Sequence, residues 1–297
     1  MSCLERVDEM LRLGIGQFSY TKPYGFEKGV VRMKEQGYSC MDYQEFVDTE
    51  TELFQKNPAQ FQEYLKEQAK CCSDHGIEIF QTHGPWRYPP RDLTKEDRAE
   101  RFEKMSRSIE GTAILGCKRM ILHPIMPFTR SDEGYGKDTW AMNLEFMEKL
   151  VQVAREYGVM LCLENMPMPD FSMASSAKVL ELAKQINDDY FKICLDTGHS
   201  AIMKSSPAGD VHLIGKDFLE ALHVHDNNGK YDIHAQPFTG VIDWEAFGAA
   251  LYKIGFDGVI NLEMHAPKKM PEQLLREEEL LLYHKAEHIA RWAAGER

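Results

Sequence analysis

Residues 159–200 read VMLCLENMPMPDFSMASSAKVLELAKQINDDYFKICLDTGHS, and this stretch decides the fold. It contains two short apolar runs, Val159–Glu164 and Phe191–Asp196. Between them, the segment Ser176–Ile186 has apolar residues at three- and four-residue spacing, which is the pattern of a helix packed on one face. Strand, helix and strand in this order predict two parallel strands joined by a helical crossover.

The same alternation runs along most of the chain. Six further segments have the composition of buried strands: Leu13–Gln17, Tyr38–Tyr43, Ile77–His83, Lys118–His123, Leu219–His225 and Gly258–Met264. The other clear helix patterns are Pro58–His75, Lys95–Leu115, Thr139–Tyr157 and Asp243–Ile254. Glycine, which helix C-caps favour, separates a helix pattern from the next strand at five places: Gly37, Gly76, Gly116, Gly158 and Gly255.

Eight strand units alternating with helices predict a closed barrel of parallel strands. We therefore expect an α/β fold, a single (β/α)8 TIM barrel that occupies residues 1–297 as one domain, with a C-terminal helix after Pro271. The alternative is an open doubly wound sheet. It is disfavoured because the unit count is eight and no GxGxxG motif follows the first strand.

Composition narrows the class of protein. Hydrophobic residues make up 43% of the 297 residues, which is enough for a large core. No apolar run reaches the length of a transmembrane helix, and Met1–Met10 does not resemble a signal peptide. The seven cysteines form no CxxC pair, so we expect free thiols and a cytoplasmic protein. A net charge of −12 weighs against a nucleic-acid partner, because duplex binding normally needs a basic face.

Metal-competent side chains end six consecutive predicted strands. The active sites of barrel enzymes lie at the carboxyl ends of the strands, so these groups should converge at one mouth. Each alone is typical of a structural hydrogen bond or a helix cap, but three carboxylates crowded together would repel one another without a cation. The six residues are His83, His123, Glu164, Asp196, His223 and Glu263.

The loops after the strands add further candidates. His199 follows Asp196 by three residues, and Asp232 with His234 forms a DxH pair after the seventh strand. His223 and His225 share one face of their predicted strand, so spacing alone leaves open which of them is the ligand. Imidazole and carboxylate ligands without cysteine suit Zn²⁺, Mn²⁺, Fe²⁺ or Co²⁺. We expect one to three divalent ions, with Zn²⁺ or Mn²⁺ favoured.

Six motifs, placed on successive strands, give the chain a resemblance to the xylose isomerase-like TIM-barrel superfamily. That superfamily includes sugar and sugar phosphate isomerases and epimerases and the endonuclease IV family. The resemblance extends from about the third strand to the eighth. The motifs are QTHGPW (81–86), ILHP (121–124), LCLENMP (161–167), ICLDTGHS (193–200), LHVHDNNGKYDIH (222–234) and INLEMH (260–265).

The resemblance to the ketose 3-epimerase branch implies a set of roles. One metal would be held by Glu164, Asp196, His223 and Glu263, the H-x-x-[D/E] pattern selecting His223 over His225. The two glutamates would form the acid/base pair, and His199 would contact the substrate. We place Trp86, His225 and Asp226 with the substrate-binding residues. The chain departs from that branch at Gly229, where the 3-epimerases have an arginine for the substrate's upper hydroxyls.

The resemblance to endonuclease IV implies a larger metal site. That family binds three zinc ions through nine ligands, whose counterparts here are His83, His123, Glu164, Asp196, His199, His223, Asp232, His234 and Glu263. The function expected from these two resemblances is a metal-dependent sugar or sugar phosphate isomerase or epimerase that transfers a proton through an enediolate. The alternative is a multinuclear zinc phosphodiesterase, and a non-catalytic binding protein is the third hypothesis. The expected partner is a small carbohydrate, without membrane association and with the oligomeric state left open.

Overall fold

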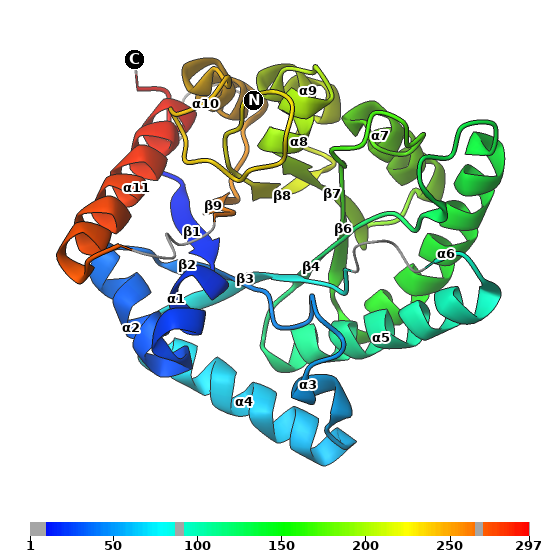
Figure 1. The fold of residues 1–297 in the computed structure, drawn as a ribbon, viewed down its shortest axis with the longest axis horizontal. Helices are drawn as coiled ribbons and strands as arrows, with labels where there is room; N and C mark the ends of the chain where they lie inside the picture. Colours follow the sequence, from blue (N-terminus) through cyan, green and yellow to red (C-terminus); the bar gives the residue numbers. More distant parts are fainter. Residues whose placement is uncertain (1–9, 87–91, 265–269, 297) are drawn as a thin grey trace, which may run out of the picture.

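The computed structural model describes residues 10–86, 92–264 and 270–296. Eight parallel strands form a nearly closed barrel, and helices surround it, as Figure 1 shows. The strand order is β8-β7-β6-β4-β3-β2-β1-β9. Their bounds are β1 Arg12–Gly16, β2 Cys40–Tyr43, β3 Glu78–His83, β4 Arg119–Leu122, β6 Met160–Glu164, β7 Phe191–Asp196, β8 Leu219–His223 and β9 Val259–Leu262. This confirms the predicted barrel and its eight strands.

The barrel closes through a short seam between β8 and β9. The two strands are joined by a parallel bridge between Val224 and Leu262. The amide of Val224 donates to the carbonyl of Asn261, and the amide of Glu263 donates to the carbonyl of Val224. The chain just beyond the two strands therefore completes the ring at its carboxyl end, where the predicted site lies.

The five helices predicted from periodicity are present. They are α4 Pro58–Asp74, α5 Lys95–Ile114, α6 Gly136–Tyr157, α7 Ser176–Ile186 and α10 Trp244–Ile254. The C-terminal helix is α11 Glu272–Ala293, which lies between α10 and α2 in the outer ring (Figure 1). In the described part of the chain, the remaining helices are α1 Phe18–Tyr24, α2 Phe26–Gln36, α3 Glu52–Gln55, α8 Thr197–Ile202 and α9 Pro207–Ile214.

Residues 159–200 show how local hydrogen bonds determine where a helix begins and ends. The hydroxyl of Ser175 caps α7 by accepting from the Lys178 amide, and Asn187 ends the helix in a left-handed conformation with φ 49°. Strands β6 and β7 then pair in parallel, with Glu164 opposite Cys194. This register places Glu164 and Asp196 at the same edge of the sheet.

Some local features differ from the sequence expectations. The strand predicted as Leu219–His225 ends at His223, and beyond it Val224 and Asp226 form only isolated bridges, to Leu262 and Ala235. A short strand, β5 Pro127–Arg130, was not predicted. It is outside the barrel order, and Thr129 in it has a positive φ of 71°. Its four residues, PFTR, have no alternating apolar pattern that would predict a strand.

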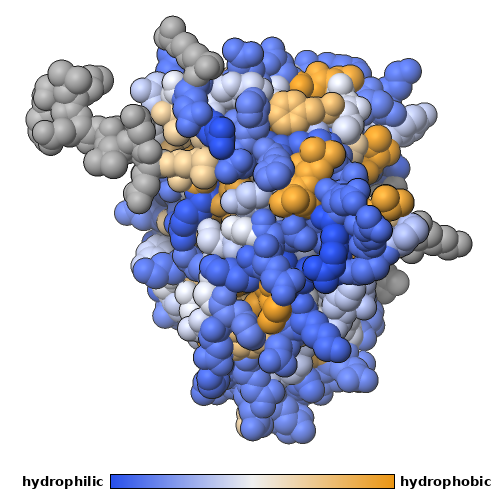
Figure 2. All heavy atoms as spheres, turned by 90° about the vertical axis from the view of Figure 1, so that its left-hand side faces the viewer, coloured by the Kyte–Doolittle hydropathy of each residue, from blue (hydrophilic) through white to orange (hydrophobic). Residues whose placement is uncertain are grey.

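The outer surface and the thiols agree with the composition. The face that contains α11 is largely hydrophilic with separate hydrophobic patches (Figure 2). None of the helices in the described ranges has the length and apolarity needed to cross a membrane. The six described cysteines are free thiols, and all but Cys71 are buried.

Candidate metal centre

The side chains predicted to bind metal meet at the carboxyl ends of the strands. A cavity of about 630 Å³ opens there. Asp196 and His223 are fully buried and contact the residues that line the cavity. The other seven predicted ligands line the cavity itself: His83, His123, Glu164, His199, Asp232, His234 and Glu263.

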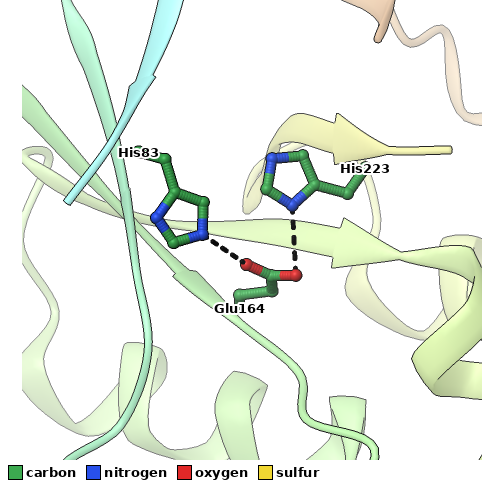
Figure 3. A group of neighbouring side chains, drawn as sticks. All are labelled: His83, Glu164 and His223. Atoms are coloured by element: carbon green, nitrogen blue, oxygen red, sulfur yellow. Dashed lines mark hydrogen bonds and ion pairs between the residues drawn. The ribbon is translucent and has the colours of Figure 1, made fainter. Parts of the chain in front are cut away.

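Glu164, at the end of β6, is the centre of an inner group. Its Oε1 lies 3.1 Å from Nδ1 of His223, and its Oε2 lies 2.9 Å from Nε2 of His123 and 3.7 Å from Nε2 of His83. Figure 3 shows His83 and His223 facing the two oxygens of Glu164. Possible ligand atoms of Glu164, Asp196, His223 and Glu263 lie within 4.8 Å of one another, so these four residues form a candidate ion site. We call these four residues the core group.

Four histidines at the mouth have the same hydrogen-bond pattern. In each, Nδ1 faces a backbone carbonyl, which can only accept, so Nδ1 must be the protonated nitrogen. His83 donates to Gly84 at 2.8 Å, His199 to Asn165 at 2.7 Å, and His234 to Glu263 at 3.0 Å. His225 donates to Asp226 at 3.3 Å.

The other nitrogen of these rings faces carboxylates. Nε2 of His199 lies 3.3 Å from Asp232 Oδ2, and Nε2 of His234 lies 3.4 Å from Asp232 Oδ1. In the neutral ring, Nε2 has a lone pair and cannot donate a hydrogen bond. Nε2 and the carboxylate oxygen would then be two electron-rich atoms facing each other, unless a proton or a cation lies between them. Metal-binding histidines typically donate their second N–H to a carbonyl or carboxylate. The residues therefore fit a divalent ion.

His223 has the opposite orientation, and Asp42 explains it. Nε2 of His223 lies 3.0 Å from Oδ2 of Asp42, and both side chains are fully buried. This leaves Nδ1 to face Glu164 and, at 3.3 Å, Oε2 of Glu263. Nothing in the strand-end pattern of the sequence points to Asp42. The one indication in the sequence is that Asp42 is an acidic residue inside the apolar segment of β2.

The charges of the site act on one another. Burial would raise the pKa of the Glu164 carboxyl, but the positive charge of His223 and the hydrogen bonds from His123 and His223 outweigh burial and hold that pKa well below its usual range. Burial would lower the pKa of His199, but the negative charges of Asp196 and Asp232 raise it to about 10. Any ion that bound here would displace protons from such histidines.

His123 is the exception among these rings. Burial lowers its pKa to about 4, because the opposing charge of Glu164 does not compensate fully. Within the described residues its Nδ1 has no hydrogen-bond partner. Its backbone is held by Arg101, which donates to the His123 carbonyl at 2.9 Å. Trp86 packs edge-on against the ring at 4.4 Å between centroids, so the predicted substrate residue Trp86 lies beside the site.

Two residues that we placed with the substrate have other contacts. The carboxylate of Asp226 accepts from the amides of Gly240 and Val241 and from the indole of Trp244. Asp226 therefore anchors the loop before α10, and its fully buried side chain is not among the described residues that line the cavity. His225 is also fully buried, with Nε2 2.9 Å from Oδ2 of Asp196.

The rest of the cavity is suited to a small polar molecule. Its wall includes the apolar side chains of Phe18, Met166 and Met168. Lys22 and Lys230 also line it. The cavity thus combines apolar faces, cationic side chains and the carboxylate cluster.

Comparison with known proteins places this geometry in a family. An uncharacterized protein of Methanocaldococcus jannaschii is 29% identical over 191 residues, which are 59% of this chain and 62% of the relative. The D-psicose 3-epimerase of Ruminiclostridium cellulolyticum is 26% identical over 211 residues, 67% of each chain. The solved structure of the IOLI protein with a bound zinc atom has a TM-score of 0.74 at 20% identity, covering 93% of this chain and 96% of that one.

The match to a family model is more extensive. Residues 31–285 match the model described as xylose isomerase-like TIM barrel. That range contains every residue predicted for the site, on six strand ends and in the loops after them. The chain belongs to the xylose isomerase-like TIM-barrel family.

Proposed function

We propose that this protein is a metal-dependent isomerase or epimerase of a sugar or sugar phosphate. One observation carries the proposal: two glutamates from non-adjacent strands, Glu164 of β6 and Glu263 after β9, flank Nδ1 of His223 at 3.1 and 3.3 Å. Both glutamates line the cavity. A small chelated substrate there would meet a carboxylate on each of two sides.

The two glutamates would exchange the proton. Glu263 is 16% exposed through its side chain, whereas Glu164 is 1% exposed, so Glu263 has the freer approach to a substrate carbon. We assign Glu263 as the base that removes the proton beside the carbonyl, and Glu164 as the group that returns one. When bound, a divalent ion held by Glu164, Asp196, His223 and Glu263 would polarise the carbonyl and stabilise the negative charge of the enediolate.

His199 would hold a substrate oxygen. It lines the cavity, and its Nδ1 is fixed by the carbonyl of Asn165. The side-chain amide of Asn165 also donates to the carbonyl of Asp196, and its Oδ1 accepts from the Asp196 amide at 2.8 Å. Asn165 therefore ties the ends of β6 and β7 together and fixes the direction of the His199 ring.

Proton exchange with solvent tests this function. A panel of ketoses, aldoses and keto-sugars is incubated in heavy water with the Mn²⁺- or Zn²⁺-loaded protein and followed by NMR. We expect one carbon-bound proton of some sugar to be replaced by deuterium. The Glu263→Gln protein, which keeps the side-chain volume but loses the base, should show no exchange. Full exchange in that variant would show that the base is misplaced.

A second candidate function is metal-dependent phosphodiester hydrolysis. The observation that favours it is a second cluster beside the core group, in which Asp232 lies within 3.4 Å of both His199 and His234. The net charge of −12 opposes a polyanionic substrate. We expect abasic-site DNA to remain uncut. Cleavage that depends on His83 and His123, without sugar exchange, would establish this function in place of the isomerase.

A further inference from the structure

We propose that the substrate carries an anionic group, a phosphate or a carboxylate, and that Gln44 and Lys22 bind this group on the β1–β2 side of the cavity. Both side chains line the cavity, together with Phe18. Gln44 follows β2, and Phe18 and Lys22 belong to α1, which follows β1. We call these three residues the anion subsite. The inference rests on the proposed function, because it names the class of sugar that the same cavity would bind.

The side-chain amide of Gln44 has a fixed orientation. The amide of Phe18 donates to Oε1 of Gln44 at 3.3 Å. Because a backbone N–H can only donate, the oxygen must face it, and Nε2 is left as a donor. Within the described ranges Nε2 has no hydrogen-bond partner, so its N–H groups are available to a ligand in the cavity. An added Cβ at Gly16 would lie 2.8 Å from Oε1 and 3.0 Å from Nε2, so this glycine makes room for the amide.

Lys22 is held at the cavity wall by an aromatic ring. Its Nζ lies 3.7 Å from the centroid of the Phe18 ring, which is within the range of a cation–π contact. Lys22 follows Phe18 by four residues in α1, so the two side chains lie on the same side of the helix. The ammonium group contacts the face of a ring, and no described carboxylate pairs with it. Its charge is therefore available to a ligand.

The polar groups that this subsite offers to a ligand are donors. An ammonium group has three N–H donors and no acceptor, and the free end of the Gln44 amide has two donors. A sugar hydroxyl bound there would find no acceptor for its own O–H, whereas a phosphate or carboxylate oxygen only accepts. Hydrogen bonds in which one partner is charged are roughly twice as strong as neutral ones. The subsite therefore suits an anionic oxygen better than a hydroxyl.

The acidic side chains nearby are directed to other partners. Glu45, which follows Gln44, accepts from Nε2 of Gln17 at 3.2 Å and from the hydroxyl of Tyr64 at 2.7 Å. Glu45 is not among the residues that line the cavity. The carboxylates that do line it each face histidines: Glu164, Asp232 and Glu263. A bound divalent ion would offset their charge further, so repulsion of an anion at the other side of the cavity is reduced.

The anion subsite adjoins the proposed base without sharing a residue with the core group. Strands β1 and β9 pair in parallel, and the hydroxyl of Ser19 in α1 donates to the carbonyl of Met264 at 2.6 Å. Met264 directly follows Glu263. An anion bound by Gln44 and Lys22 would thus hold one end of the sugar while the carbonyl end reaches the core group.

Binding of matched sugars to the Mn²⁺-loaded protein tests the subsite. The probes are fructose and ribulose, the terminal phosphate ester of each, and fructuronate. Calorimetry measures each dissociation constant. We expect one anionic class, the esters or the acid, to bind at least about 10-fold more tightly than the free ketoses. The class that binds more tightly identifies the anion as phosphate or carboxylate.

Two matched variants locate the effect. Lys22→Met keeps the apolar stem but removes the charge. Gln44→Glu keeps the acceptor for the Phe18 amide but replaces the donor with a second carboxylate oxygen. Each should weaken binding of the anionic sugar about 10-fold, and binding of the free ketoses should change less. The control is Lys28→Met, an exposed lysine of α2 that is not among the cavity residues, which should bind as the wild type does.

The wild-type comparison does not depend on the folding of any variant. Equal or weaker binding of both anionic classes than of the free ketoses would overturn the proposal, as would undiminished binding of the anionic sugar by folded Lys22→Met and Gln44→Glu proteins. If free ketoses exchange protons and the anionic sugars bind no more tightly, this inference fails and the proposed function stands. If anionic sugars bind through Lys22 and Gln44 but no sugar exchanges a proton, the subsite stands and the proposed function fails.

Discussion

At the scale of the residue, hydrogen bonding decides which nitrogen of each histidine is offered to an ion. Four rings donate Nδ1–H to a backbone carbonyl, whereas His223 has its Nε2 against Asp42. The sequence could predict which side chains meet at the mouth, because strand ends converge in a barrel. It could not predict the ring orientations, because the carbonyls of Gly84 and Asn165 that fix two of them have no signal in residue type.

Replacing Asp42 tests the orientation of His223. Asp42→Asn keeps the volume but removes the charge that holds Nε2–H, so the core ion should bind about 10- to 100-fold more weakly. Competition with a chromophoric chelator measures the affinity. The control is Asp210→Asn, a buried aspartate bonded to Ser176 and Ser205, which should leave the affinity unchanged. Equal effects of the two variants would show that Asp42 acts only through the fold.

The pKa values of His199 and His234 predict how the stability of the metal-free protein depends on pH. Burial would lower the pKa of both His199 and His234, but neighbouring carboxylates raise both pKa values from 6.5 to about 10. A pKa that is higher in the folded state stabilises the protein below pH 6.5, and the stabilisation is lost as pH rises to about 10. With chelator present, the urea midpoint should therefore be lower at pH 9.5 than at pH 7.

Asp232→Asn is the control for that pH dependence. Asp232 contacts both His199 and His234, so the variant should depend less on pH between 7 and 9.5. A wild-type midpoint that rises over this interval would contradict the charge assignment.

At the scale of the element, the spacing of apolar residues and the residues that cap the helices made the barrel predictable. Strands such as β7 are continuous apolar runs, and helix α7 has a clear apolar face between a serine cap and Asn187. Short elements in which apolar residues do not recur at a regular spacing were not predicted. Helix α8 has six residues, all buried, so no polar face distinguishes it from a buried strand or loop.

The attachment of α11 to the barrel depends on a buried ion pair. The Nε of Arg32 in α2 lies 2.8 Å from Oε2 of Glu279 in α11, and the side chains are 7% and 9% exposed. Arg32→Met would leave Glu279 buried without this partner, so we expect a loss of about 3–5 kcal/mol in the free energy of unfolding. Urea denaturation at a fixed metal concentration measures it.

An exposed pair on the same helix provides the comparison. Arg276 pairs with Glu272, and both side chains are more than half exposed. Arg276→Met should cost less than about 1 kcal/mol. Similar losses in the two variants would show that burial of the Arg32 pair does not matter.

At the scale of the whole molecule, the candidate metal centre lies across the weakest closure of the barrel. Strands β8 and β9 meet through the Val224–Leu262 bridge, and His223 and Glu263 belong to opposite sides of that seam. An ion that binds both would connect the two sides. Bound metal should therefore stabilise the fold by about 4 kcal/mol at a free concentration of roughly 1,000 times its dissociation constant.

Elemental analysis of protein purified without chelator tests the central claim most directly. Nine side chains predicted to bind metal through nitrogen or oxygen gather at one mouth, so we expect at least one divalent ion per chain. Chelator should lower the melting temperature, and Mn²⁺ or Zn²⁺ should restore it. The Glu164→Gln and Asp196→Asn proteins should hold less metal. A wild-type content far below one ion per chain, with no thermal gain when either metal is added, would contradict the account.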